Sequence, residues 1–324
     1  MSAFSRISPA SLALLLMAGA LLAASALFAA HGGGGGWRLW LPALLAWGAL
    51  WLANAHWSAM PAHASGLLAK LAGIGIPLIF GASLLFLWEI FCLGFGIPTV
   101  LLPAPSLIAA KISASLPALG ADFTQTVIRA AIPGWLMGSA LGFAAALACD
   151  RFDFLRRGLM PIGNFISALP VIGIAPILVM WFGFDWQSKA AVVVVMTFFP
   201  MLVNTVAGLA ASGAMERDLM TSYGASWFQT LARLRLPAAL PFIFNALKIN
   251  ATLAMIGAIV AEFFGTPTVG MGFRISTEIG RMALDMVWAT IAVAAIAGSA
   301  FYGLLALAEK AVTFWHPSYR QPQG

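Results

Sequence analysis

Long apolar runs separated by short polar stretches dominate this chain. A helix needs about 20 apolar residues to cross the hydrocarbon core of a membrane. Runs of that kind lie at about residues 10–30, 37–55, 74–97, 127–148, 161–183, 190–210, 237–261 and 286–308. The pattern therefore predicts an all-α integral membrane protein with about eight transmembrane helices.

The fifth run, SALPVIGIAPILVMWFGF, is interrupted by Pro170 and Pro176. Proline removes a backbone donor and breaks or kinks a helix. A broken helix at membrane depth is tolerated only where neighbouring protein or a water-filled path satisfies its backbone. We therefore expect this run to face neighbouring protein or a water-filled path rather than lipid.

Composition agrees with the membrane class. The 324 residues are 61% hydrophobic and 9% charged, whereas soluble domains carry about 25% charged residues. The formal net charge of +6 suits loops that face anionic lipid. Nucleic-acid binding is disfavoured because the chain has no basic cluster with interleaved aromatic residues.

Charge placement predicts the orientation. An even number of spans puts both termini on one side, and ten Lys and Arg residues then lie in cytoplasmic segments against six outside. This bias favours cytoplasmic termini. The first run could instead be a signal peptide, but its apolar length exceeds the usual 7–15 residues, so we interpret it as a true span.

No catalytic or metal site is evident in the sequence. Cys92 and Cys149 lie inside apolar runs, where cysteine usually behaves as a small buried hydrophobe. The four histidines are scattered singly without ligand spacing. No paired His and Asp at a span end suggests a membrane enzyme.

An amphipathic stretch separates the sixth and seventh runs. Its apolar residues recur at steps of four, four, four and three, which predicts one face of a helix; they are Leu219, Tyr223, Trp227, Leu231 and Leu234. Gly224 offers a left-handed bend, and Pro237 suits the first turn of the next helix. We therefore expect two short helices joined at a glycine at the membrane surface.

Two interpretations of this stretch remain open. It could lie among lipid headgroups with its apolar side buried. It could instead bind a partner protein, because the adjacent Trp227 and Phe228 cannot both face lipid on one helix, and exposed aromatic residues favour protein interfaces.

The same stretch resembles a motif of ABC importer permeases, the inner-membrane components of binding-protein-dependent transport systems. Their loop reads E-A-A-x-x-x-G, nine residues, then I-x-L-P. Here DLMTSYG occupies 218–224 and LRLP occupies 234–237, with Leu219 and Met220 in place of the two alanines. The stretches LLPAPSLI, FFPMLVNTVAGL and LPAALPFIFNALKI are similar to the nitrate, sulfonate and taurine branch. The resemblance covers about residues 75–318.

The resemblance implies a type I ABC importer permease core of six helices from about residue 74. The permease domain would span residues 71–318, its cytoplasmic coupling loop 211–237, and residues 1–70 would form an additional N-terminal transmembrane hairpin and linker. The residues expected to contact the ATPase are Glu216, Arg217, Asp218, Tyr223, Gly224, Ala225, Trp227, Phe228, Leu234 and Pro237.

The expected partners follow from the family. They are an ATP-binding subunit in two copies, an extracytoplasmic solute-binding protein and a second permease copy, with a homodimer favoured over a heterodimer. The location would be the bacterial inner membrane. No glycine cluster supplies the lysine of a phosphate-binding loop, so we expect no cofactor on this chain, with ATP and Mg²⁺ bound by the partner.

Polar residues within spans are candidates for the translocation path; they are Asn164, Asn204, Asn250 and Glu262. Amides bond neighbouring helices together about as often as they bind cargo. Glu262 could equally pair with Arg274 or Arg281, and we expect Lys248 to reach the membrane interface.

The cargo is open. The family branch suggests a sulfonate, nitrate or taurine-like solute, and the segment 262–285 resembles permeases for pyrimidine-like precursors. We expect this segment to form a folded loop or a short re-entrant helix. A secondary transporter or channel is the rival class, but such carriers usually bury a carboxylate at mid-membrane, and here the acids lie near span ends, Glu89 excepted.

Overall fold

The computed structural model describes residues 9–30, 36–58, 67–167, 170–265 and 268–315. Every regular element in these residues is a helix, so the predicted all-α class is confirmed. The chain divides into two compact units. The first contains residues 1–114 and 282–288, and the second contains residues 115–281 and 289–324. The predicted domain boundary at residue 70 lies inside the first unit.

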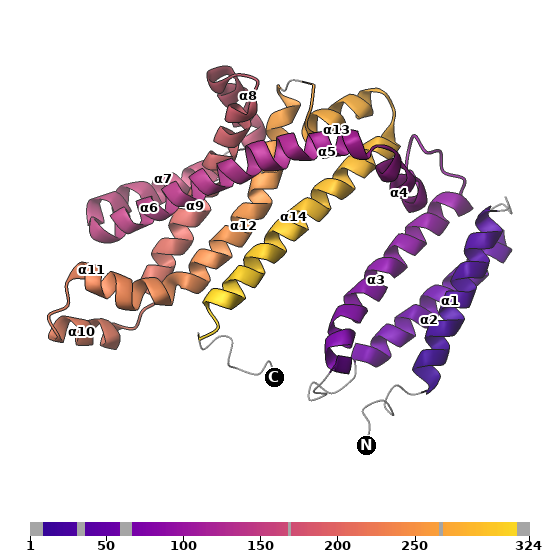
Figure 1. Cartoon of the computed structure of the whole chain (residues 1–324), viewed down its shortest axis with the longest axis horizontal. Helices are drawn as coiled ribbons and strands as arrows, with labels where there is room; N and C mark the ends of the chain where they lie inside the picture. The colour runs from indigo at the N-terminus through magenta and orange to yellow at the C-terminus, as the bar shows by residue number, and fades with distance from the viewer. Residues whose placement is uncertain (1–8, 31–35, 59–66, 168–169, 266–267, 316–324) are drawn as a thin grey trace. The chain divides into compact units, whose positions relative to one another are not determined.

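Three long helices and one short one form most of the first unit: α1 (Pro9–Ala30), α2 (Trp37–Ser58), α3 (Leu67–Gly94) and α4 (Pro105–Ala114). Helices α1, α2 and α3 lie side by side (Figure 1). The buried residues Leu39, Ala43 and Ile90 form their common core. The α1–α2 pair is the helical hairpin expected from the sequence, and α3 packs onto it as a third member.

Glu89 fixes the start of α4. Its carboxylate accepts hydrogen bonds from Ser106 N at 2.9 Å and from Ser106 Oγ at 2.6 Å. A carboxylate at a helix N-terminus satisfies unpaired N–H groups and complements the helix dipole. The acid nearest the middle of a predicted span therefore has a structural role.

The second unit contains the remaining helices. Their bounds are α5 (Leu116–Phe123), η2 (Thr124–Ala131), α6 (Ile132–Arg151), α7 (Asp153–Ser167), α8 (Val171–Phe182), α9 (Trp186–Ala210), α10 (Ala214–Ser222), α11 (Trp227–Thr230), η3 (Leu231–Arg235), α12 (Leu236–Phe263), α13 (Met271–Gly280) and α14 (Leu284–Val312), whose first residues belong to the first unit. The segments η2 and η3 are π-helical.

Helices α5, η2 and α6 form one continuous helix from Leu116 to Arg151. The helix therefore begins earlier than the apolar run predicted at 127–148. The polar residues Asp122 and Thr126 ended the apolar pattern, but both are fully buried and bond to other parts of the unit.

Each π-helical segment ends two positions before a proline. The turn before Pro133 closes with a bond from Ile132 N to Val127 O, and the turn before Pro237 closes with one from Leu236 N to Leu231 O. Proline lacks the N–H of an α-helical bond and clashes with the carbonyl four residues earlier. The wider π turn relieves that clash, so both helices continue through their prolines.

Helices α6 and α9 approach along a row of glycines. Gly134, Gly138 and Gly142 of α6 all face α9. A Cβ at Gly138 would lie 2.0 Å from Thr197 Oγ1, and one at Gly142 would lie 2.4 Å from Phe198 O. Small residues at this spacing let membrane helices pack backbone to backbone. Because residue numbers rise together along the row, α6 and α9 are parallel.

The parallel arrangement requires the chain to return between α6 and α9. Helices α7 and α8 make this return, and residues 168–169 between them lie outside the described residues. The single predicted span 161–183 is thus corrected to two helices. Pro170, with an extended backbone at ψ 119°, begins the second one, whereas Pro176 lies inside α8 without ending it.

Helix α12 runs antiparallel to α9 and packs closely on it. A Cβ at Gly208 of α9 would lie 3.0 Å from Ala239 Cβ, near the start of α12. The amide of Asn250 joins the three central helices, because its Nδ2 donates to Ser139 Oγ of α6 at 3.0 Å and to Thr197 O of α9 at 2.8 Å. Helices α6, α9 and α12 therefore form the centre of the second unit.

Helix α14 attaches through large side chains. Trp135 of α6 meets Phe301 with ring centroids 5.0 Å apart. Lys248 of α12 forms a 2.6 Å ion pair with Glu309. A charge in an apolar helix is thus paired with an opposite charge on a neighbouring helix, and the expectation that Lys248 reaches the membrane interface stays a prediction.

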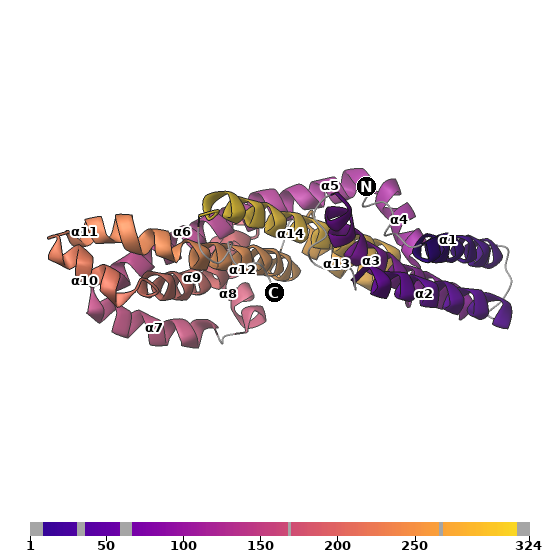
Figure 2. The ribbon, with the colours of Figure 1, turned by 90° about the horizontal axis from the view of Figure 1, so that it is seen from below.

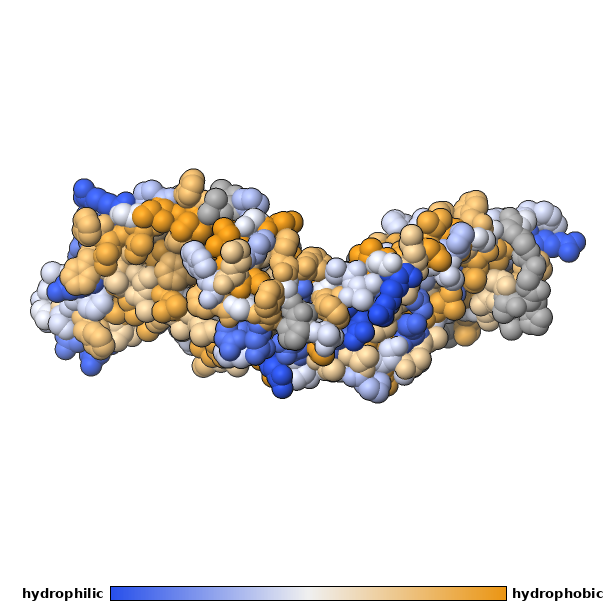
Figure 3. All heavy atoms as spheres, turned by 90° about the horizontal axis from the view of Figure 1, so that it is seen from above, coloured by the Kyte–Doolittle hydropathy of each residue, from blue (hydrophilic) through white to orange (hydrophobic). Residues whose placement is uncertain are grey.

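Five described helical stretches are long and apolar enough to cross a membrane: Gly75–Gly94, Leu116–Arg151, Trp186–Ala210, Trp227–Phe263 and Leu284–Val312. The described parts of α1 and α8 are shorter apolar helices. Figure 3 shows apolar side chains spread over the visible surface of the helices rather than confined to their contacts. This surface is typical of helices that face lipid or partner helices.

Candidate functional site

The segment between α9 and α12 forms two short helices, α10 and α11, called here the α10–α11 hairpin. Gly224 joins them with a φ of +69°, in the left-handed region that glycine adopts readily. Ser226 and Gln229 form a capping box at the start of α11, with Gln229 Oε1 accepting from Ser226 N at 2.8 Å. Figure 2 shows the hairpin at one end of the second unit. The predicted glycine joint between two helical segments is confirmed, but only α10 is a separate short helix, because α11 continues into α12.

Apolar side chains on the hairpin point away from the rest of the unit. The exposed fractions are 83% for Met215, 55% for Leu219, 81% for Tyr223 and 70% for Phe228. A large aromatic side chain that packs against nothing within its own chain is a candidate for contact with a partner.

The predicted single apolar face was wrong. Leu219 and Tyr223 are exposed, whereas Trp227 and Leu234 are partly buried and Leu231 is buried. The bend at glycine interrupts the helical repeat, so residues four apart across it do not share a face. Trp227 packs against the buried cluster around Leu231, and Phe228 points outward.

The charged residues of α10 accompany this exposed surface. Glu216 and Asp218 are exposed, and Arg217 is partly exposed. Ala225 is partly buried, and its N–H donates to Met220 O at 3.0 Å to close the turn between the helices. The hairpin therefore presents carboxylates between its exposed apolar residues.

Pro237 lies in the first turn of α12, as predicted, but it does not separate this helix from the segment before it. The helix is continuous from Trp227 to Phe263, and Pro237 lies inside it behind the π-helical turn. Because of this continuity, α11 is a direct extension of α12.

The base of the hairpin is held by Asp150, at the end of α6. Its carboxylate accepts a hydrogen bond from Arg235 Nη1 at 2.8 Å, another from Arg235 Nη2, and one from Trp227 Nε1 at 3.3 Å. Arg235 Nε also donates to Leu209 O of α9 at 3.1 Å. The guanidinium of Arg151 lies 5.5 Å from the Trp227 ring centroid. One arginine thus joins the ends of α6, α9 and α12.

The predicted path residues lie at separate places. Asn164 is in α7, and its side chain lies outside the described residues. Asn204 of α9 donates to Pro200 O at 2.8 Å and accepts from Asn245 Nδ2 at 3.4 Å. Asn250 is fully buried in this chain, with no partner for its Oδ1 among the described residues. A role for these three in the path stays a prediction.

Glu262 is buried near the C-terminal end of α12, with an exposed fraction of 2%. Its carboxylate accepts hydrogen bonds from Thr126 Oγ1 at 2.8 and 3.0 Å and from Gly272 N at 2.7 Å. Among the described residues it has no ion pair with Arg274 or Arg281, so that alternative was wrong.

The two arginines bind other carboxylates. Arg274 Nε pairs with Asp122 at 2.8 Å, and Arg281 Nη1 pairs with Glu278 at 3.2 Å. The hydrogen bond to Asp122 raises the pKa of Arg274 above its ordinary value. Asp122 also accepts from Gly270 N at 2.9 Å. Two buried carboxylates therefore fix the start of α13, Asp122 from α5 and Glu262 from α12.

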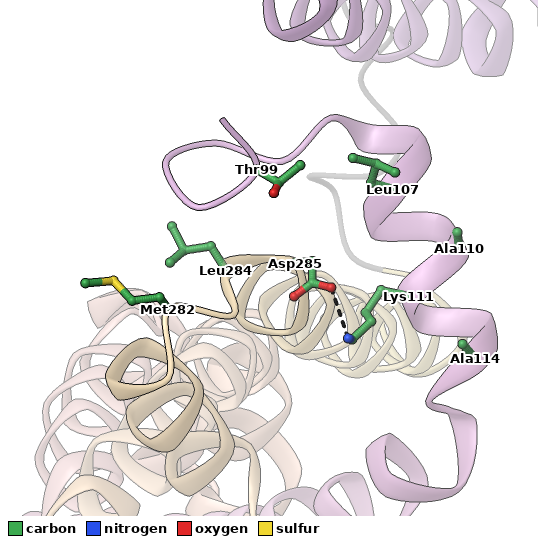
Figure 4. Close-up of a pocket in the computed structure, with 8 residues that line it drawn as sticks. All are labelled: Thr99, Leu107, Ala110, Lys111, Ala114, Met282, Leu284 and Asp285. Atoms are coloured by element: carbon green, nitrogen blue, oxygen red, sulfur yellow. Dashed lines mark ion pairs between the residues drawn. The ribbon is translucent and has the colours of Figure 1, made fainter. Parts of the chain in front are cut away.

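A surface pocket of about 420 Å³ lies within the first unit, between α4 and the start of α14 (Figure 4). Lys111 and Asp285 form a 3.0 Å ion pair across it, and Leu107 and Leu284 line its apolar part. The pair is about one-third exposed on each side, so solvent screens it. No sequence pattern predicted this pocket, because its walls are distant along the chain.

Sequence reasoning also missed the ion pair at the hairpin base. Asp150 was visible only as part of the charged turn DRFDFLRR, and Arg235 as a charge near the L-P motif. An Asp that ends a long apolar run and an Arg that begins another are the available signals, but pairing them requires the tertiary structure.

Comparison with known proteins agrees with this architecture. Residues 138–314, more than half of the chain, match the family model described as binding-protein-dependent transport system inner membrane component.

Three relatives are similar over much of their length. The riboflavin transport system permease protein RibX of Chloroflexus aurantiacus is 28% identical over 76% of this chain and 91% of its own. The formylaminopyrimidine transport permease protein ThiX of Halalkalibacterium halodurans is 34% identical over 61% and 78%. The putative aliphatic sulfonates transport permease protein SsuC of Bacillus subtilis is 26% identical over 75% and 88%. With the family model, these similarities show that the chain belongs to the inner-membrane components of binding-protein-dependent transport systems, the permease subunits of ABC importers.

Proposed function

We propose that this permease receives its ATP-hydrolysing subunit on the exposed side of the α10–α11 hairpin. The observation that carries the proposal is a set of apolar side chains, 55–83% exposed, on a hairpin whose base is fixed by a part-buried ion pair. Exposed aromatic residues on a rigid support bind proteins well, because little conformational entropy is lost on binding.

The chemistry of the hairpin favours a protein partner over lipid headgroups. Interfacial helices carry Lys and Arg on their polar side. Here the exposed carboxylates of Glu216 and Asp218 lie beside Met215 and Leu219. An anionic membrane surface would repel these acids, whereas basic residues of a protein partner would attract them.

ATP and Mg²⁺ would be bound by that partner. The sequence contains no lysine-bearing phosphate loop, so the free energy of hydrolysis has to enter this chain through a contact. Closure of the partner would then bias the permease between two states.

The assembly would contain two permease copies and two ATP-hydrolysing subunits. Each chain carries one permease-type core without an internal duplicate, and the exposed apolar faces of the helices leave surface for a second copy. The hairpin and both termini would face the cytoplasm, and the region around α13 would meet the solute-binding protein on the other side.

The cargo would be a small polar solute. The names of the relatives point to two chemical classes, an aliphatic sulfonate and a nitrogen heterocycle. The binding protein that works with this permease can separate them. Calorimetric titration of that protein with taurine, an alkyl sulfonate, riboflavin and formylaminopyrimidine should show binding to one class.

The docking proposal is tested by co-purification. Tyr223→Asp with Phe228→Asp should lower the recovery of the ATP-hydrolysing subunit about 10-fold or more, since hot-spot residues each contribute about 2 kcal/mol or more. The matched control is Tyr223→Phe with Phe228→Tyr, which keeps both rings. Equal recovery with the two aspartates would contradict the proposal.

A secondary transporter is disfavoured by the same structure. The acids that such a carrier would use already bind other groups of this chain. Glu89 caps α4, and Glu262 accepts hydrogen bonds from Thr126 Oγ1 and Gly272 N. Uptake by the purified chain alone in liposomes, driven by an ion gradient, would support that rival.

A further inference from the structure

We infer that the Asp150–Arg235 ion pair is the joint through which movement of the α10–α11 hairpin reaches α6. This inference rests on the proposed docking of an ATP-hydrolysing subunit at the hairpin, and it assigns positioning roles to Asp150, Arg235 and Trp227.

Chain connectivity explains why a joint is needed. The hairpin continues α9 at one end and α12 at the other, with α11 and α12 forming one helix. Helix α6 has no direct chain connection to the hairpin, although it packs on α9 and its Phe143 and Leu147 contact the cluster around Leu231. The last turn of α6 is linked to the hairpin by the bonds that Asp150 accepts from Arg235 and Trp227 and by the stacking of Arg151 on Trp227.

The position of Arg235 matters because it ends the π-helical segment Leu231–Arg235. A π turn is a weak point in a helix and readily absorbs a displacement. The guanidinium is fixed to Asp150 of α6 and to Leu209 O of α9 at this point. A displacement of the hairpin is therefore shared with three helices instead of being lost in the π turn.

The burial of the pair suits a rigid joint. The side chains of Arg235 and Asp150 are 16% and 10% exposed, so water screens them little. Two parallel N–H···O bonds also fix the relative orientation of the two groups. The neighbouring pair Arg157–Asp153 has side chains 82% and 73% exposed, and such surface pairs contribute little.

Helix α6 is suited to transmit a displacement along its length. The glycine row at Gly134, Gly138 and Gly142 packs it backbone to backbone on α9. The same continuous helix extends to Leu116, at the end opposite Asp150. Gly120 is exposed near that end, with open space where a side chain would lie, so it is a suitable reporter position.

The test uses the complex of the full chain with the ATP-hydrolysing subunit that co-purifies with it. Cys92 and Cys149 are replaced by Ala, and Gly120→Cys supplies one thiol. The maleimide labelling rate of this thiol is measured with and without ATP plus orthovanadate. Asp150→Asn should reduce the nucleotide-induced change about 5-fold or more, within the range of known coupling effects, while recovery of the ATP-hydrolysing subunit stays within about 2-fold.

The matched control is Asp153→Asn, which removes one carboxylate three positions away and should leave the nucleotide-induced change intact. Asp150→Asn leaves Arg235 partly buried and unpaired, so the double variant Asp150→Asn with Arg235→Gln is made as well. It removes both charges and should transmit as poorly as the single variant, because the two residues act as a pair.

Each outcome decides the inference. An equal nucleotide-induced change in labelling rate in Asp150→Asn and Asp153→Asn would overturn the inference. It would also be overturned if nucleotide did not change the labelling rate of the Gly120→Cys thiol in the parent chain. Failure of both Asp150 variants to accumulate in the membrane would assign the pair to folding alone and overturn it too. Loss of co-purification in the parent chain would instead refute the proposed docking.

Discussion

At the scale of single residues, this protein depends on positions where a neighbour occupies the space that a side chain would need. Gly138 and Gly142 let α6 touch α9, and Gly270 leaves room for the carboxylate of Glu262, whose Oε1 would be 2.7 Å from an added Cβ. These glycines allow backbones to approach closely. A membrane protein needs such contacts because the hydrophobic effect does not drive helix association in lipid.

Gly138→Ala should lower the free energy of unfolding by about 1–3 kcal/mol, the usual penalty for overpacking, because its Cβ would lie 2.0 Å from Thr197 Oγ1. Thermal unfolding of the detergent-solubilised chain measures the effect. Gly120→Ala, which has open space around it, is the control and should be neutral or stabilising. Equal unfolding temperatures for the two variants would contradict this packing.

Glu262→Gln should also destabilise the chain, by about 1–3 kcal/mol. The amide provides one acceptor oxygen where Thr126 Oγ1 and Gly272 N both donate, and its NH₂ group would face a donor. Unfolding in a denaturing detergent series gives the comparison. Glu216→Gln, at an exposed position on α10, is the control and should leave the free energy of unfolding unchanged. An equal loss of stability in this control would contradict the role given to the Glu262 carboxylate.

At the scale of elements, turn chemistry and helix breakers decide where each helix begins and bends. Gly224 separates α10 from α11, whereas Pro237 fails to separate α11 from α12 because a π turn absorbs it. The hairpin is therefore one short helix, α10, folded back on the extended end of another.

Gly224→Ala should loosen the hairpin by about 1–2 kcal/mol, the cost of the left-handed conformation for a residue with a Cβ. No neighbour lies within 4 Å of the added atom, so the effect comes from the backbone alone. Gly224→Asn should be milder, because Asn tolerates this conformation. Hydrogen exchange of the amides at 219–225 reports the change, and identical exchange in Ala and Asn variants would argue against it.

At the scale of the whole molecule, the direction of the helices in the second unit sets the topology. Helices α6 and α9 run parallel, α7 and α8 return the chain between them, and α12 runs back along α9. The hairpin consequently lies at the end of the unit opposite α13, whatever the assignment of the two sides.

Cysteine labelling tests the assignment of sides. In a chain without native cysteines, Tyr223→Cys and Phe314→Cys should react with an impermeant maleimide only after the membrane of spheroplasts is opened. Arg281→Cys, 67% exposed in its side chain, should react before. Labelling of Tyr223→Cys in closed spheroplasts would invert the proposed orientation.

Much of the fold could be predicted because the determining signals are local. The length of an apolar run fixes that a segment is a membrane helix, and the glycine and L-P spacing around residue 224 identified both the hairpin and the family. Local signals failed where burial overrides polarity. The polar residues Asp122 and Thr126 made the first turns of a helix look like a loop. The helical period placed Trp227 on the same face as Tyr223, although a bend at Gly224 separates them.

By itself, the sequence determined the all-helical membrane class, the hairpin between the sixth and seventh runs and the family, since each depends on neighbouring residues along the chain. Only the tertiary structure decided the partners of Glu262, the inward turn of Trp227 and the pairing of Asp150 with Arg235. Those two residues are 85 positions apart, and no pattern of apolar positions records which of several charges will meet once the helices have packed.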